Sequence, residues 1–140
     1  MEVLIIISPN AKMSELKKIP KLVDDLVKRN IKIIFMNIGF NQSLENYLVK
    51  IKYSNFNKLN FSMKYSIEEK FILLKEYYFE NIIVLGLIKN DKITKFLDYY
   101  IGTNTNLFLI TPKYGVYSDS FSLINDGAYL LGSVNDLLKP

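Results

Sequence analysis

The chain alternates between two patterns of apolar residues. Short continuous apolar runs, rich in β-branched residues, have the length of buried strands and lie at residues 3–7, 31–38, 82–88 and 107–110. Between these runs, apolar residues recur every third or fourth position, as they do on one face of an amphipathic helix. Strands that alternate with helices predict an α/β fold, a three-layer Rossmann-like domain with a mostly parallel sheet.

Several helix boundaries are marked by residues that suit a helix start. Pro20 fits the first turn of one helix, because its missing N–H is not needed there. Ser66 and Glu69 have the spacing of a capping box at the start of another helix. The other expected elements are a helix over 44–51, a weak strand over 59–63, a helix over 93–100, and a short strand and a Ser-capped helix after 128.

The length of 140 residues is that of one domain, and no repeat, linker or low-complexity stretch divides the chain. We therefore predict a single domain over residues 1–140. The apolar runs are far shorter than the ~20 residues that a membrane helix needs. The first residues also lack the basic region of a signal peptide. These features predict a cytoplasmic protein with no membrane partner.

The composition excludes several classes of chemistry. The chain has no Cys and no His, so it cannot form disulfides, thiolate nucleophiles, Ser-His-Asp triads or the usual zinc sites. The adjacent pairs Asp24–Asp25 and Glu68–Glu69 diverge on their helices, and no carboxylate cluster has the spacing of a metal site. No glycine-rich dinucleotide motif or P-loop is present. We therefore predict no catalytic residue, no metal and no cofactor.

Lysine carries the positive charge of the chain. The formal net charge is +4, and Arg29 is the single arginine. Loops that follow parallel strands meet at one edge of the sheet, and four lysines are expected in such loops: Lys12, Lys89, Lys92 and Lys113. This favours contact with a phosphate backbone, with little base preference because arginine is scarce. Solubilising lysines without a partner explain the same charge equally well.

The segment 120–138, SFSLINDGAYLLGSVNDLL, resembles the end of the Rossmann-like domain of the DNA-processing A (DprA, Smf) family. The matching positions are Leu123, Ile124, Gly127, Ala128, Ser133, Asp136 and Leu137. A fainter similarity includes Ser8 after the first strand, Gly39 in the turn after the second, and Ile93–Thr94 at a helix start. The family's Ser-Gly-x-Ala-x-Gly-x-Asp loop is absent, and Lys70 alone keeps a positive charge where the family has Arg-Asn-Arg.

This resemblance implies a non-catalytic protein that binds single-stranded DNA and passes it to a RecA-type recombinase, in natural transformation or repair. It also implies a homodimer formed through the exposed parts of 120–138. The residues expected to bind nucleic acid are Ser8, Lys12, Gly39, Lys70, Lys89, Lys92 and Lys113. Gly127 and Ala128 are expected to be structural, since glycine adopts backbone conformations that side chains resist.

Two alternatives come from other classes of protein. Related Rossmann-like domains bind nucleotide-derived small molecules at the strand ends, where Gly39 and the loop at Ser8 are placed to shape a pocket. The second alternative is a degenerate dimeric scaffold that has lost its ligand, which the missing Arg and Gly motifs favour.

Overall fold

A computed structural model of the chain describes residues 1–9, 11, 13–36, 56–59, 65–87, 92–110, 123–124 and 126–138. Six strands in these residues form one sheet in the order β3-β2-β1-β4-β5-β6, and every neighbouring pair is parallel. The strands are β1 (Glu2–Ile7), β2 (Lys32–Met36), β3 (Phe56–Leu59), β4 (Asn81–Leu85), β5 (Asn106–Ile110) and β6 (Tyr129–Leu130).

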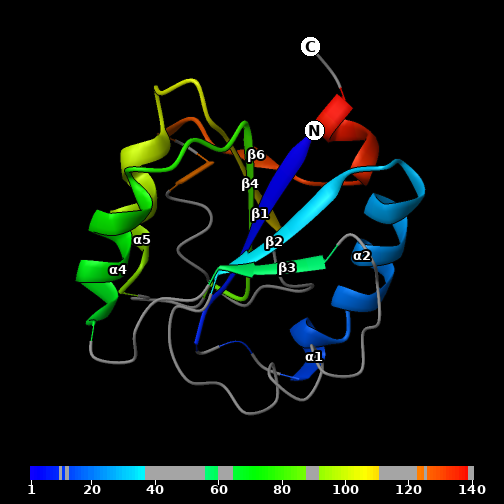
Figure 1. The fold of residues 1–140 in the computed structure, drawn as a ribbon, viewed down its shortest axis with the longest axis horizontal. Coiled ribbons are helices and arrows are strands. Elements are labelled where there is room, and N and C mark those ends of the chain that lie inside the picture. Colours follow the sequence, from blue (N-terminus) through cyan, green and yellow to red (C-terminus); the bar gives the residue numbers. More distant parts are fainter. Residues whose placement is uncertain are drawn as a thin grey trace.

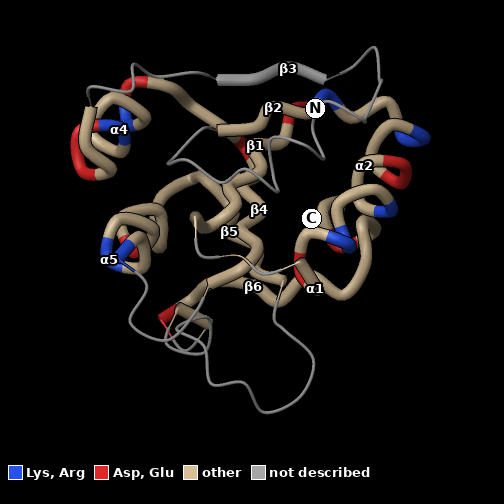
Figure 2. The backbone as a smooth tube through the Cα atoms, turned by 90° about the horizontal axis from the view of Figure 1, so that it is seen from below, with Lys and Arg blue, Asp and Glu red and all other residues tan. Residues whose placement is uncertain are grey.

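Helices cover both faces of this sheet, as Figures 1 and 2 show. One face carries α1 (Met13–Leu16), α2 (Ile19–Lys28) and the 3-10 helix η2 (Val134–Leu138). The other carries α4 (Ile67–Leu74), α5 (Thr94–Leu97) and the 3-10 helix η1 (Asp98–Tyr100). The predicted three-layer α/β fold with a parallel sheet is therefore confirmed.

The central strand β1 explains why the sheet is covered on both faces. Successive side chains of a strand point to opposite faces, and all residues of β1 after Glu2 are buried. Val3, Ile5 and Ile7 join the hydrophobic core under α2, whereas Leu4 and Ile6 join the core under α4 and α5. A strand that is apolar at every position thus serves two cores at once.

The helix boundaries follow the capping residues only in part. Ser66 and Glu69 form the predicted capping box: Ser66 Oγ accepts from the Glu69 N–H and Glu69 Oε1 accepts from the Ser66 N–H, each at 3.1 Å. The expected Ser-capped C-terminal helix is instead the 3-10 helix η2. There Asp136 Oδ2 accepts from the N–H groups of Gly132, at 2.9 Å, and Ser133, at 3.1 Å.

Other differences concern short or uncertain elements. A weak strand was expected over 59–63, whereas the strand in this region, β3, spans Phe56–Leu59, and residues 60–63 lie outside the described residues. Helix α1 was not predicted, because four residues are too few to show a helical period. The helix expected over 44–51 lies outside the described residues. Among the described residues, no helix has the length and apolar character needed to cross a membrane.

Candidate functional site

The strand order sets the place where a ligand is expected to bind. Crossovers run outward from β1 to β2 and β3 on one side, and from β4 to β5 and β6 on the other. The order reverses between β1 and β4, and in doubly wound sheets ligands bind outside the carboxyl ends of the strands at this switch point. The candidate site is therefore built from the segments that follow Ile7 and Leu85.

Just beyond β1 and β4, the two chain segments pack directly on each other. Ser8 is fully buried, and its N–H donates to Leu85 O at 3.0 Å. The chain then turns, so that the Ala11 N–H donates to Ser8 O at 3.0 Å. Ala11 lies against Gly86, where a Cβ would come within 2.5 Å of the Ala11 Cβ. Gly86 thus permits contact between two protein segments, and Ala11 occupies the space above it.

A cavity of about 840 Å³, here named the α4–α5 cavity, opens on the face of the sheet that carries α4 and α5. Its apolar wall includes Ile67, Phe96 and Leu123, and Ser66 and Thr94 add hydroxyl groups. The Phe96 ring stacks on that of Phe71, with centroids 5.1 Å apart and planes inclined by 9°. This contact fixes a flat aromatic surface in the cavity wall.

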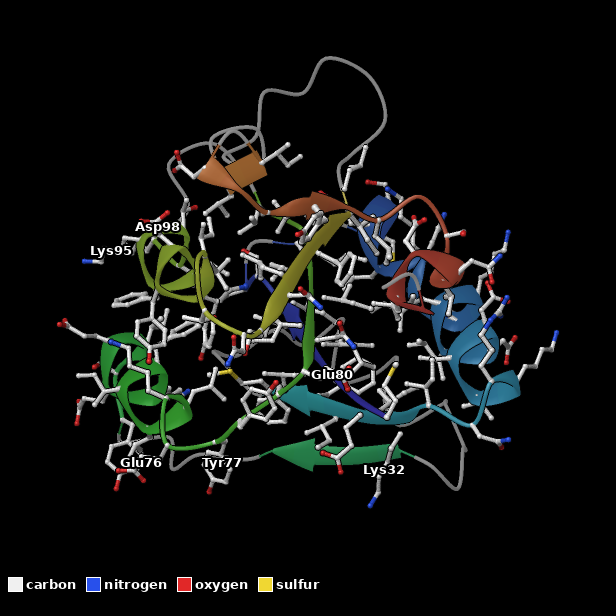
Figure 3. All side chains as sticks on the ribbon, turned by 90° about the horizontal axis from the view of Figure 1, so that it is seen from above. Lys32, Glu76, Tyr77, Glu80, Lys95 and Asp98 are labelled. Carbon is white, nitrogen blue, oxygen red and sulfur yellow. The ribbon has the colours of Figure 1, made fainter. Side chains whose placement is uncertain are left out.

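Charges of both signs line the α4–α5 cavity. The cations are Lys92 and Lys95, and the carboxylates are Glu68, Asp98 and Asp126. Lys95 and Asp98 lie on the side of α5 that faces away from the sheet in Figure 3. Lys95 Nζ lies over the Phe96 ring, 4.9 Å from its centroid, so an ammonium group rests against a face of that ring. The lining therefore combines an apolar wall with two cations and three carboxylates.

A second cavity, of about 420 Å³, opens on the opposite face of the sheet. It lies between the turn that joins α1 to α2 and the segments at the ends of β5 and β6. Three lysines, Lys17, Lys18 and Lys21, contribute to its lining, so we name it the lysine cavity. Two cavities of different character thus lie on the two faces of the sheet.

The structure describes three of the predicted binding residues, Ser8, Lys70 and Lys92. Ser8 is buried at the end of β1, and Lys92 is exposed and lines the α4–α5 cavity. Lys70 is only 3% exposed, and burial lowers the pKa of its ammonium group. Lys12, Gly39, Lys89 and Lys113 lie outside the described residues.

The predicted structural pair has the geometry of a tight turn into β6. Gly127 has a φ of +129°, a conformation that residues with a Cβ rarely adopt. A Cβ there would also lie 3.1 Å from Ile101 Cγ2. Ala128 is buried, and its N–H donates to Leu123 O at 2.9 Å.

Sequence reasoning missed the lysine cavity and the wall of the α4–α5 cavity. A signal for the first was present, because Lys17 and Lys21 are four residues apart and share one side of a helical path. Phe96 lies within the helix predicted over 93–100, and its half-buried position in a cavity wall depends on where α4 and α5 meet. Within the part of the chain that is described, no group of three or more Asp and Glu side chains is placed to hold a metal ion.

The strand order defines a doubly wound α/β protein. A solved structure with a similar fold is the dodecameric FMN-dependent UbiX-like decarboxylase from Escherichia coli O157:H7. The TM-score is 0.55 at 9% sequence identity, and the match covers 99% of this chain and 88% of that one. No family model matches the chain, and no curated protein matches it significantly.

The comparison contradicts the predicted binding of single-stranded DNA, and with it the assignment to transformation or repair. The similar fold belongs to an FMN-dependent decarboxylase, and Lys70 is too deeply buried to reach a DNA backbone outside the protein. The prediction failed because one fold serves many functions, so a likeness in sequence pattern does not specify a ligand. Nothing supports a recombinase as partner, and the resemblance to the DNA-processing A family stays a prediction.

The comparison also bears on catalysis and assembly. The similar structure is an enzyme, whereas we predicted a non-catalytic protein. It is also a dodecamer, which is compatible with the predicted self-association of this chain. The comparison does not show which surface of this chain would form the contact. The single-domain prediction remains to be tested.

Proposed function

We propose that this chain binds a flavin nucleotide, with FMN as the first candidate, in the α4–α5 cavity. The observation that carries the proposal is a cavity of about 840 Å³ on a doubly wound sheet, with an aromatic wall and two lysines. Cofactor pockets commonly measure roughly 300–1,000 Å³ and combine apolar walls with a few polar groups. The likeness to an FMN-dependent decarboxylase supports the same ligand class.

The residues of the cavity fit the two halves of FMN. The isoalloxazine ring needs apolar surroundings, and Ile67, Phe96 and Leu123 form the apolar part of the lining. The phosphate needs cations or hydroxyl donors, and Lys92, Lys95 and Thr94 lie in the same lining. Flavins, when bound, supply hydride-transfer and related redox chemistry.

We also propose that this protein is an enzyme that uses the bound flavin. The chain has no His and no Cys, so proton transfer beside the flavin falls to other groups. The carboxylates that line the cavity are Glu68, Asp98 and Asp126, and they are the residues available to hold or move a proton.

The test is a titration of FMN with the purified protein, in which flavin fluorescence is the readout. Stacking on the cavity wall should quench the fluorescence in a saturable way. Charge reversal of both lysines, K92E with K95E, should weaken FMN binding about tenfold, because two attractive contacts become repulsive. Riboflavin lacks the phosphate, so its binding should change little in the same variant.

Lys32→Glu is the matched control. Lys32 is an exposed lysine that lies far from α5 (Figure 3), and its ion pair with Glu2 spans 4.0 Å between exposed groups. This control should bind FMN like the parent protein. Absence of saturable quenching would overturn flavin binding. Equal binding by the K92E/K95E variant would place the flavin elsewhere.

A further inference from the structure

The lysine cavity is formed by segments that are far apart in the sequence. One wall is the turn between α1 and α2, with Lys17 and Lys18, and continues onto α2 at Lys21. The other wall follows the end of β6, with Gly132 and Ser133. The strand ends at Ile110 and Leu131 also line the cavity, so it opens at the carboxyl edge of the sheet, where ligands of such folds bind.

The charge of the cavity is unbalanced. Three lysines line it against a single carboxylate, Asp25. Lys17 and Lys21 are exposed, and neither forms an ion pair with a described residue. Lysines that converge on one cavity repel one another, and a bound anion removes that repulsion. The lining therefore favours a ligand with at least one concentrated negative charge.

The backbone holds the lysines in place before any ligand arrives. The Lys17 N–H donates to Met13 O at 3.0 Å, and the Lys18 N–H donates to Glu15 O at 3.1 Å. The Leu22 N–H donates to Lys18 O at 3.2 Å, which continues the helical path into α2. Leu16 and Ile19, on either side of the turn, are fully buried. The three ammonium groups are thus carried by an ordered segment.

The opposite wall contributes a hydroxyl group and apolar surface. The N–H groups of Gly132 and Ser133 both donate to Asp136 Oδ2 and are not available to a ligand. Ser133 keeps its side chain at the exposed rim. The buried side chains of Leu22 and Val134 form an apolar part of the lining. The combination suits an anionic head group attached to a small, partly apolar body.

We infer that the lysine cavity binds the phosphate group of a small phosphorylated molecule, at a site separate from the proposed flavin site. The ammonium groups of Lys17, Lys18 and Lys21 would neutralise the phosphate, and Ser133 is placed to donate to it. The cavity lies on the α2 face and the α4–α5 cavity on the other, so the sheet stands between them. This inference does not depend on flavin binding.

Pyrophosphate and glycerol 1-phosphate are the probes for this site, with glycerol as the uncharged comparison. Each is titrated into isotopically labelled protein and followed by amide shifts in two-dimensional NMR. The shifts should concentrate at residues 17–22 and 132–134 and should be absent with glycerol. The variant K17E/K21E should lose binding by about tenfold or more, since two attractive contacts become repulsive.

Lys28→Glu is the control, because Lys28 is an exposed lysine two turns further along the same helix. It should bind the probes like the parent protein. The K92E/K95E variant should also keep phosphate binding, and K17E/K21E should keep FMN binding, so failure at one site is distinguishable from failure at the other. Unchanged binding in K17E/K21E, or an equal loss in K28E, would overturn the site.

Discussion

Tyr100 shows how much a single buried hydroxyl matters to this protein. Its side chain is 5% exposed, and its hydroxyl has no hydrogen-bond partner among the residues that the structure describes. Its ring meets that of Tyr99 edge-on, with centroids 5.1 Å apart. Burial, with a smaller contribution from Tyr99, raises the pKa of Tyr100 to about 12. The hydroxyl loses its water on folding and gains no partner in return.

Replacing Tyr100 by Phe should therefore stabilise the protein. We expect the free energy of unfolding in urea at neutral pH to rise by about 1 kcal/mol, because the unsatisfied hydroxyl is removed and the ring is kept. Tyr129→Phe is the control, since Tyr129 is 55% exposed and its hydroxyl is not buried. A loss of stability in Tyr100→Phe would show that the hydroxyl has a partner in solution.

The same residue gives the parent protein a dependence on alkaline pH. The pKa of tyrosine is near 10 in the unfolded chain and about 12 for folded Tyr100. Between these values the folded state binds more protons than the unfolded state, so stability falls as pH rises. The difference in the free energy of unfolding between Tyr100→Phe and the parent protein should thus grow above pH 10.

At the scale of elements, the contact between the segments after β1 and β4 is the most constrained feature of the site. Gly86 has a φ of +85°, and its Cα hydrogen faces Ala11, whose Cα would lie 3.1 Å from a Cβ built there. Gly86→Ala combines a strained backbone with a steric clash. We expect it to lower the free energy of unfolding by roughly 2–4 kcal/mol in urea.

Two further variants separate the backbone strain at Gly86 from the steric clash with Ala11. Gly102 has a similar φ, +83°, but nothing lies within 4 Å of a Cβ built there. Gly102→Ala should therefore lower the free energy of unfolding through backbone strain alone, by about 1 kcal/mol. Combining Gly86→Ala with Ala11→Gly should recover roughly 1 kcal/mol or more of the clash, measured as a double-mutant coupling. Equal losses for Gly86→Ala and Gly102→Ala would contradict contact between the two segments.

Elements with a local signal could be predicted from the sequence. The run at 3–7 gave β1, and the Ser66–Glu69 spacing gave the start of α4, since a capping box depends only on neighbouring residues. The 3-10 form of η2 could not be predicted in this way. Its Arg29 contact, from Nη2 to Asn135 Oδ1 at 2.6 Å, joins residues 106 positions apart.

The candidate site was harder to predict than the fold. The pattern predicted ligand binding at the strand ends, and Lys92, one of the predicted residues, lines a cavity. Yet the lysine cavity has walls from residues 17–25 and 131–134, and no local pattern shows that these two segments line one cavity. The lysines also led to a nucleic-acid ligand, although net charge does not distinguish a DNA backbone from a phosphorylated small molecule.

At the scale of the whole molecule, one strand pair ties the two hydrophobic cores together. β1 and β4 pair over five residues each, from Val3 with Asn81 to Ile7 with Leu85, and both strands send side chains into both cores. We therefore expect a single cooperative unfolding transition in urea, with the same midpoint by far-UV circular dichroism and by tyrosine fluorescence. Separate midpoints would contradict the prediction of a single domain.

The position of β1 also decides when this chain can fold during its synthesis. β1 leaves the ribosome before any other strand, but its partner β4 is complete only when Leu85 has emerged. Val134 and Leu137 join the core under α2 only after they have emerged in turn. Until then the apolar strand has an unpaired edge, open to aggregation or to a chaperone. The native sheet and the core under α2 can therefore be completed only after β4 and the segment up to Leu137 have been synthesised.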